Sequence, residues 1–364
     1  MERTWKLVVA VVVVVALLVA SLFTGVYDLT GEDGVEMFFT TRVPRTVALI
    51  LAGAVMAMSG LVMQLITQNR FVEPTTTGTT EWAGLGLIGI MIVWPTAPII
   101  VRMIAAVVAA TIGTTIFFLF LRRVSLRSSL VVPIVGIMLG AVVGALSTFV
   151  ALQFDMLQAL GVWFAGSFTS VIKGQYEVLW IVTIVLVVVW FIADRLTAAG
   201  LGEDVATNLG INYKHVMLTG TLLIAVATGV VTVVVGNLPF IGLIVPNIVS
   251  LMLGDNLRKN LPWVALLGIG TVTACDLIGR TIIMPFEIPV SVVLGVVGGN
   301  LRPPNNRRQG QSLHQHRHHD HGGHHENNEI PVRHRRAHRQ RHCQGHATAQ
   351  ASHGAHHPIP VNLA

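Results

Sequence analysis

Long apolar runs constrain this chain more than any other feature of its sequence. Runs such as Trp5–Phe23, 178–193 and 216–235 approach or reach the roughly 20 residues that a helix needs to cross a bilayer. Because lipid offers no hydrogen-bond partners to the backbone, runs of this kind form helices. Charged residues make up only 12% of the chain and its mean hydropathy is +0.69, which excludes a soluble domain. The sequence therefore predicts an all-α polytopic membrane protein.

The runs divide into ten predicted transmembrane segments. They lie near residues 5–23, 46–66, 79–94, 97–121, 129–151, 178–193, 216–235, 239–253, 262–284 and 287–299. The positive-inside rule then places the N-terminus and the cationic loops inside, among them Arg122, Arg123, Arg127, Lys214 and Arg258, and the acidic segment of Asp28, Glu32 and Asp33 outside. The first run has no small-residue cleavage site, so we expect it to be retained in the lipid bilayer. Residues 155–176 are predicted to hold a short re-entrant or interfacial helix on the outer face.

The last predicted segment is truncated, and the chain changes character where it stops. Its apolar residues run only from about Phe286 to Gly299, which as a helix rise about 21 Å against a hydrocarbon core of about 30 Å. We therefore divide the chain into a membrane domain, 1–299, and a tail, 300–364. The tail holds 9 Arg, 14 of the 15 His and no Lys, Phe, Tyr or Trp, so it is predicted to be disordered. A metal-binding tract is one hypothesis for it. An out-of-frame reading of the true last helix is the other, and the abrupt change within a span favours it.

A polar stretch, 201–211, separates two of the apolar runs. It begins with Gly200-Leu-Gly202 and ends with Leu209-Gly210, so short helical turns bracketed by glycines fit it well. Two hypotheses remain for it: a surface loop, or a rigid knob that docks on a soluble protein. The residues that would carry the knob are Leu201, Gly202, Glu203, Asp204, Leu209 and Gly210.

Several charges lie within or at the ends of apolar runs, where ionisable groups are costly. Asp276 and Arg280 stand four residues apart and can pair on one helical face. That pair is either structural or places Arg280 at the outer surface for an acidic partner. Arg42 and Arg45 flank Pro44, and are either interfacial anchors or a fixed cationic patch.

Sequence signatures of an enzyme do not occur in residues 1–299. There is no phosphate-binding loop, dinucleotide fingerprint, catalytic carboxylate pair, nucleophile elbow or metal-ligand spacing. This part of the chain carries 15 basic and 15 acidic residues, so no basic surface indicates a nucleic-acid partner. If the chain performs driven transport, another chain supplies the energy.

Seven motifs stand in order along the membrane domain. They are Arg42-Val-Pro-Arg45-Thr, Gly53 to Gln64, Asn69 to Pro74, Trp163 with Gly166-Ser167, Leu201 to Gly210, Phe240 to Pro246, and Asp276 to Arg280 followed by Glu287-Ile-Pro289. Residues 1–299 resemble in these motifs the FecCD-type permeases of type II ATP-binding-cassette importers, which take up ferric siderophores, haem or vitamin B12. The resemblance implies a bundle of ten helices per subunit in the bacterial cytoplasmic membrane.

The same resemblance implies partners and site residues. The partners are a second permease subunit (identical or sister), a cytoplasmic ATPase dimer that uses ATP and Mg, and an extracytoplasmic siderophore-binding protein. This chain would itself bind no cofactor or metal. The resemblance also implies that residues 201–211 couple to the ATPase. It implies that the binding protein contacts Arg42, Arg45 and Arg280. Candidates for pathway or packing positions are Gly53, Gly60, Gln64, Pro246 and Asn247.

Departures from the family pattern indicate which of the family's substrates to expect. Asn247 stands where the family often has His, Ser291 where Gly is usual, and 69–82 differs from the usual Asn-Pro-Leu-Ala form. This combination is similar to the branch that serves catecholate or petrobactin-type siderophores. We therefore expect a ferric-siderophore importer permease.

Two alternatives stay open at this point. One is an inactive, truncated permease, because the last helix is short. The other is a stand-alone channel or an ion-coupled carrier. Against the carrier, we expect the spans to lack the buried carboxylates that ion coupling generally needs.

Overall fold

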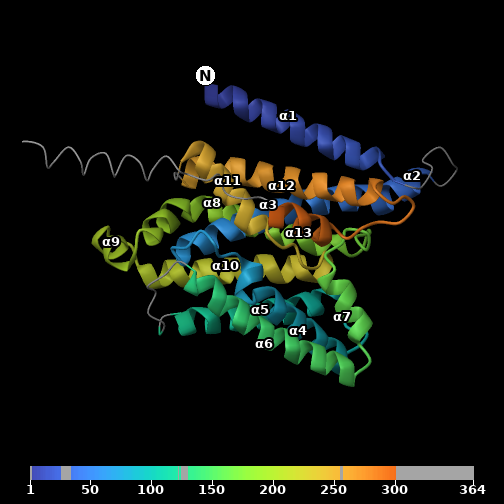
Figure 1. The fold of residues 1–364 in the computed structure, drawn as a ribbon, viewed down its shortest axis with the longest axis horizontal. Helices are drawn as coiled ribbons and strands as arrows, with labels where there is room; N and C mark the ends of the chain where they lie inside the picture. Colours follow the sequence, from blue (N-terminus) through green and yellow to red (C-terminus); the bar gives the residue numbers. More distant parts are fainter. Residues whose placement is uncertain (1, 26–33, 122, 124–129, 255–256, 301–364) are drawn as a thin grey trace, which may run out of the picture. The chain divides into compact units, whose positions relative to one another are not determined.

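The computed structural model describes residues 2–25, 34–121, 123, 130–254 and 257–300. Predictions that concern Asp28, Glu32 and Asp33, the loop at Arg122 and Arg127, and the tail from residue 301 lie outside the described residues. The described part contains helices and no strand, as expected from its apolar runs (Figure 1). Residues Met1–Pro303 form one compact unit.

Every predicted transmembrane segment is a helix at the expected place. The α-helices are α1 (Glu2–Phe23), α2 (Gly34–Met37), α3 (Val43–Ile66), α4 (Thr79–Val93), α5 (Ile99–Leu121), α6 (Val131–Gln153), α7 (Leu157–Phe164), α8 (Ile181–Gly200), α9 (Glu203–Asn208), α10 (Tyr213–Val234), α11 (Ile241–Leu253), α12 (Leu257–Thr281) and α13 (Val290–Asn300). Three shorter turns of other helical types are η1 (Phe38–Arg42), η2 (Pro74–Thr77) and η3 (Tyr176–Trp180). The short helix predicted within 155–176 is α7.

Helix length corrects one part of the prediction. Among the described residues, 7 helices are long and apolar enough to cross a membrane. The segments Thr79–Val93, Ile241–Leu253 and Val290–Gly299 are shorter, although the first two were predicted as full spans. A 13-residue helix such as α11 rises only about 20 Å. The shortness of α13 is therefore shared by two other segments.

Helix α3 is the central element of the bundle. It packs against α8, α10, α11 and α12, and most of its side chains are buried. A Cβ atom built on Gly53 would lie 2.9 Å from the carbonyl oxygen of Gly268, and one built on Gly60 would lie 2.1 Å from Cα of Gly242. The backbone of α3 therefore touches the backbones of α12 and α11, which only glycine permits at these two positions.

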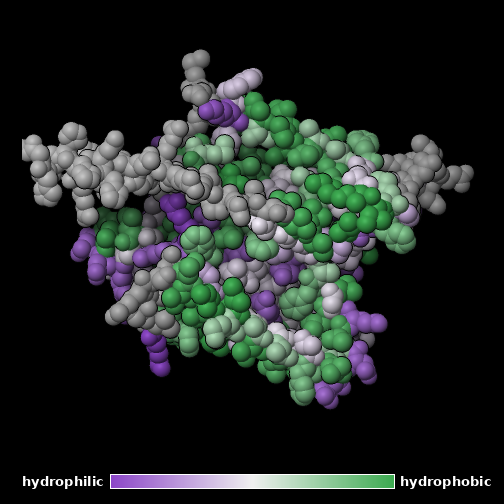
Figure 2. All heavy atoms as spheres, viewed as in Figure 1, coloured by the Kyte–Doolittle hydropathy of each residue, from purple (hydrophilic) through white to green (hydrophobic). Residues whose placement is uncertain are grey.

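Large apolar side chains cover much of the outside of the bundle (Figure 2). Trp5 on α1 is 69% exposed and Val142 on α6 is also 69% exposed. A soluble monomer rarely exposes apolar surface over such an extent. The surface therefore fits lipid or other membrane-embedded chains, in agreement with the predicted class.

Candidate functional site

The two ends of the bundle differ in chemistry, and we name them by what they carry. The arginine end holds Arg45 at the start of α3, and the α9 end holds α9. Figure 1 shows α9 at one end of the bundle and α2, which directly precedes η1 and Arg42, at the other. Helix α3 runs from the arginine end towards the α9 end.

At the arginine end, five charged residues from three parts of the chain form an arginine cluster. It consists of Arg42, Arg45, Asp276, Arg280 and Glu287. Nη2 of Arg45 lies 2.7 Å from Oδ1 of Asp276 and 2.9 Å from Oε2 of Glu287. Nη2 of Arg280 lies 2.7 Å from Oδ2 of Asp276, so the pair predicted from the four-residue spacing is present. The cluster joins α3, α12 and the turn that precedes α13.

Two of the three arginines are anchored to the end of α1. Nη1 of Arg280 donates to the carbonyl oxygens of Ser21, at 3.2 Å, and Thr24, at 2.9 Å. Arg42 donates through Nη1 to Leu22 and Thr24 carbonyl oxygens. The last carbonyls of a helix lack partners within it, and the helix dipole favours a cation there. Arg42 and Arg280 therefore cap α1.

Because two of the arginines cap α1, fewer of them are accessible to a docking partner than the sequence predicted. Arg42 is 6% exposed and Arg280 is 4% exposed. Arg42 is therefore not open as a member of a surface patch with Arg45, and Arg280 does not lie open at the outer surface. The physical reason is that the end of α1 needs donors, which the sequence pattern alone does not reveal. Arg45 keeps more exposure, with 13% of its side chain accessible. Its role in docking remains a prediction.

Glu287 is the accessible acid of the cluster. Its Oε2 accepts a hydrogen bond of 2.6 Å from the Thr169 hydroxyl. Although partial burial favours the neutral acid, the hydrogen bond and charge of Arg45 hold the pKa of Glu287 below its ordinary value. A cavity of about 650 Å³ opens beside the cluster and is lined by Arg45, Thr169 and Glu287 among others. The cavity wall carries more positive than negative charge and is suited to a carboxylate.

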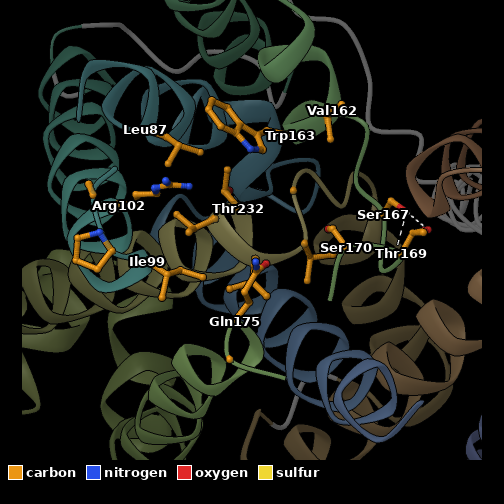
Figure 3. Close-up of a pocket in the computed structure, with 17 residues that line it drawn as sticks. Leu87, Ile99, Arg102, Val162, Trp163, Ser167, Thr169, Ser170, Gln175 and Thr232 are labelled. Atoms are coloured by element: carbon orange, nitrogen blue, oxygen red, sulfur yellow. Dashed lines mark hydrogen bonds between the residues drawn. The ribbon is translucent and has the colours of Figure 1, made fainter. Parts of the chain in front are cut away.

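A second cavity, of about 760 Å³, lies next to the segment that carries Thr169. Figure 3 shows Arg102 and Trp163 on one side of it with Thr232 of α10, and the Ser167–Thr169 pair on the other. The hydroxyls of that pair are 2.8 Å apart. Because Thr169 lines both cavities, the 165–175 segment connects the arginine cluster to this second space.

In the bundle interior, Glu73 caps α11 from the turn between α3 and α4. Its Oε1 accepts from the backbone N–H of Phe240 at 2.8 Å, and its Oε2 accepts from Leu243 at 3.1 Å. Helix α11 has no side-chain cap of its own, and Glu73 is 1% exposed. Sequence reasoning assigned Glu73 no role. The available signal was a carboxylate just before Pro74, between two apolar runs.

A proline in α11 explains the position of Gln64. Pro246 has no N–H, so the carbonyl oxygen four residues earlier, on Gly242, lacks its helical partner. Nε2 of Gln64 donates to that oxygen at 3.0 Å. Asn247 donates to the Arg70 carbonyl at 2.9 Å, which ties the same helix to the turn after α3. These contacts bind α11 tightly to α3.

Helix α4 carries a carboxylate oxygen that is buried in the bundle. Glu81 lies in the first turn of α4, and its Oε2 is buried without a hydrogen-bond partner. A Cβ built on Gly140 of α6 would lie 3.6 Å from that oxygen. Helix α4 begins against α6, so an acid that the sequence places near a turn becomes buried. The apparent lack of buried carboxylates is therefore no evidence against an ion-coupled carrier.

At the opposite end, the 201–211 stretch folds into α9 between two glycines. Gly202 has φ 112° and Gly210 has φ 74°, values that glycine adopts without strain. Ala206 is fully buried, while Leu201, Val205 and Leu209 are 64%, 42% and 62% exposed. Glu203 and Asp204 are also exposed. The predicted helical turns are present, and they carry an apolar stripe, four residues apart, that nothing in the described chain covers.

Comparison with known proteins identifies the family. Residues 6–301 match the model of the FecCD transport family. The petrobactin import system permease protein FatD of Bacillus anthracis is 62% identical over 81% of this chain and 89% of its own length. The petrobactin import system permease protein YclN of Bacillus subtilis is 38% identical over 80% of this chain and 94% of its own length.

A solved structure has the same fold. It is an inward-facing conformation of a metal-chelate type ABC transporter, with a TM-score of 0.71 and 22% identity, and the match covers 81% of this chain and 96% of that one. At this identity the likeness concerns the fold alone. With its helical bundle, its motifs and the family match over most of its length, the chain belongs to the FecCD transport family.

Proposed function

We propose that this chain is the permease subunit of an ATP-driven importer that moves a ferric siderophore into a bacterial cell. The observation that carries the proposal is its similarity to petrobactin import permeases, at 62% and 38% identity over most of the chain. The substrate class we assign is therefore a petrobactin-like ferric siderophore. The partners would be a second permease subunit, a separate ATPase dimer and a siderophore-binding protein.

The charges favour one orientation in the cell membrane. Arg195 at the end of α8, Lys214 at the start of α10 and Arg258 at the start of α12 lie towards the α9 end. Glu177 and Glu287 lie towards the arginine end. Under the positive-inside rule, the α9 end faces the cytoplasm and the arginine end faces outwards.

In this orientation each end has a partner of suitable chemistry. The exposed Val205 of α9 and the exposed Leu201 and Leu209 beside it would enter an apolar cleft of the ATPase, because their exposure to water is otherwise unfavourable. Arg45, in the cavity of the arginine cluster, would receive a carboxylate of the siderophore-binding protein.

The transport cycle follows from contacts that differ between two states. ATP and Mg bind in the ATPase dimer, whose closure moves α9. Helix α9 is joined to α8 and α10 by short glycine-containing links, so its movement tilts both helices. The permease then opens outwards, receives the siderophore, and returns inwards after hydrolysis.

Reconstitution tests this function. The permease, its ATPase and its binding protein would be placed in liposomes, and uptake of radioactive iron as ferric petrobactin would be measured with and without ATP. We expect ATP-dependent uptake that needs the binding protein. Uptake driven by a proton gradient in the absence of ATPase would instead establish the ion-coupled carrier, which Glu81 keeps open.

The truncated permease is tested by growth. A strain without its own siderophore permease would receive this chain as it is, or with residues 300–364 replaced by an apolar continuation of α13. Growth of both strains under iron limitation would show that the short last helix is tolerated. Growth of only the second would identify this chain as an inactive copy.

A further inference from the structure

Arg45 binds two carboxylates that differ in accessibility. The side chain of Asp276 is 0% exposed and also pairs with Arg280. The side chain of Glu287 is 26% exposed and lies at the cavity of the arginine cluster. Removing Asp276 would leave two buried guanidinium groups without their shared partner, which is strongly unfavourable. Only Glu287 is placed so that another carboxylate can replace it.

We propose that Glu287 is an internal substitute for a carboxylate of the docking protein, and that docking displaces it from Arg45. This inference rests on the proposed function, because it needs a binding protein that docks at the arginine end. The exchange replaces one carboxylate with another, so Arg45 never becomes an unpaired charge. The cavity beside the cluster gives the incoming carboxylate room to approach.

Displacement of Glu287 has a consequence for the second cavity. Glu287 accepts a hydrogen bond from Thr169 at 2.6 Å, so its movement removes one attachment of the 165–175 segment. The segment keeps three backbone bonds to other parts of the chain that do not involve the cluster. They run from Lys173 N–H to the Thr40 carbonyl at 3.0 Å, from Ser167 N–H to the Val235 carbonyl at 2.9 Å, and from Ser291 N–H to the Gly166 carbonyl at 3.3 Å. The 165–175 segment is therefore released at Thr169, while backbone hydrogen bonds still hold both of its ends.

Thr169, where the segment is released, lies on the wall between the two cavities. Thr169 lines both of them, and its neighbour Ser167 lies on the rim that faces Trp163 and Thr232 in Figure 3. Docking at Arg45 would thus loosen the wall of the cavity that α10 also borders. Glu287 acts as a positioning residue, which keeps this wall fixed until the binding protein arrives.

The test is the affinity of the siderophore-binding protein for the assembled permease–ATPase complex in lipid nanodiscs. Glu287→Gln keeps the size of the side chain and removes the competing charge. We expect the dissociation constant to fall about two- to fivefold, as for loss of a part-exposed charged pair. The matched control is Glu36→Gln, which removes the charge of an exposed acid of α2 at the same end. We expect it to leave the affinity unchanged.

A second variant keeps the proposal testable if Glu287→Gln does not assemble. Thr169→Val changes an exposed side chain and removes the hydrogen bond that steadies Glu287, so we expect a smaller tightening in the same direction. A purely structural role predicts weaker binding for both variants. Unchanged or weaker binding in both, with Arg45→Gln still abolishing docking, would overturn this inference alone. Binding that is absent in the unmodified complex would overturn the proposed docking itself.

Discussion

The cap that Glu73 places on α11 leads to a prediction whose size follows from the contacts. In Glu73→Ala, the N–H of Phe240 loses its acceptor at a site that is 1% exposed, whereas the N–H of Leu243 loses one of two acceptors and keeps the Phe240 carbonyl at 3.2 Å. A buried donor left without a partner costs about 1–3 kcal/mol. This one donor, together with about 0.5–1.5 kcal/mol for the hydrogen bond lost at Leu243, gives an expected loss of about 1.5–4.5 kcal/mol in the free energy of unfolding.

The substitution Glu73→Gln distinguishes the loss of the capping hydrogen bonds from the loss of side-chain packing, because it keeps the size of the side chain. The amide keeps one acceptor oxygen, so the N–H of Phe240 stays paired, only the hydrogen bond to Leu243 is lost, and the expected loss is about 0.5–1.5 kcal/mol. The Thr75 hydroxyl, 2.7 Å from Oε1, can still reach an amide oxygen. The ranking should therefore be unmodified protein, then Gln, then Ala.

The assay is unfolding of the purified permease in mixed detergent micelles, followed by tryptophan fluorescence. Glu177→Gln is the matched control, since Glu177 lies outside the α11 contacts and should change the midpoint little. Stability of Glu73→Ala within about 0.5 kcal/mol of the unmodified protein would refute the reasoning, because surface substitutions alone have effects of that size.

Further predictions concern other parts of the molecule. Gly60→Ala should destabilise by about 1–3 kcal/mol, because its Cβ would lie 2.1 Å from Cα of Gly242, whereas Gly89→Ala meets nothing within 4 Å and should be neutral in the same unfolding assay. Replacing Glu203 and Asp204 with Lys should abolish stimulation of the ATPase by the binding protein in liposomes while leaving assembly intact; persistent stimulation would contradict the coupling role of α9. Glu287 has a lowered pKa, so its contribution to stability is present above the ordinary carboxyl pKa of 4.5 and is lost as the pH falls through its lower folded value. Thermal midpoints of the unmodified protein should therefore fall more steeply on acidification than those of Glu287→Gln, and parallel curves would contradict this.

Sequence reasoning was most successful where a single local property decides the structure. Apolar runs specify membrane helices because lipid cannot satisfy the backbone, and each predicted segment is a helix. The glycines around 201–211 predicted α9, since both adopt positive φ angles. The four-residue spacing of Asp276 and Arg280 predicted their pair, which is present at 2.7 Å. The order of motifs along 1–299 predicted the family, which the match over residues 6–301 confirms.

The tertiary structure decided which groups meet across long separations in the chain. Arg42 and Arg280 cap α1, although their sequence context equally allowed an exposed patch. Glu73 meets α11 across 167 residues, and no periodicity encodes such a contact. The burial of Glu81 depends on where α4 starts against α6. Helix type and topology follow from hydrogen bonding and hydrophobicity along the chain, whereas the partner of each buried charge depends on the packing of the whole bundle.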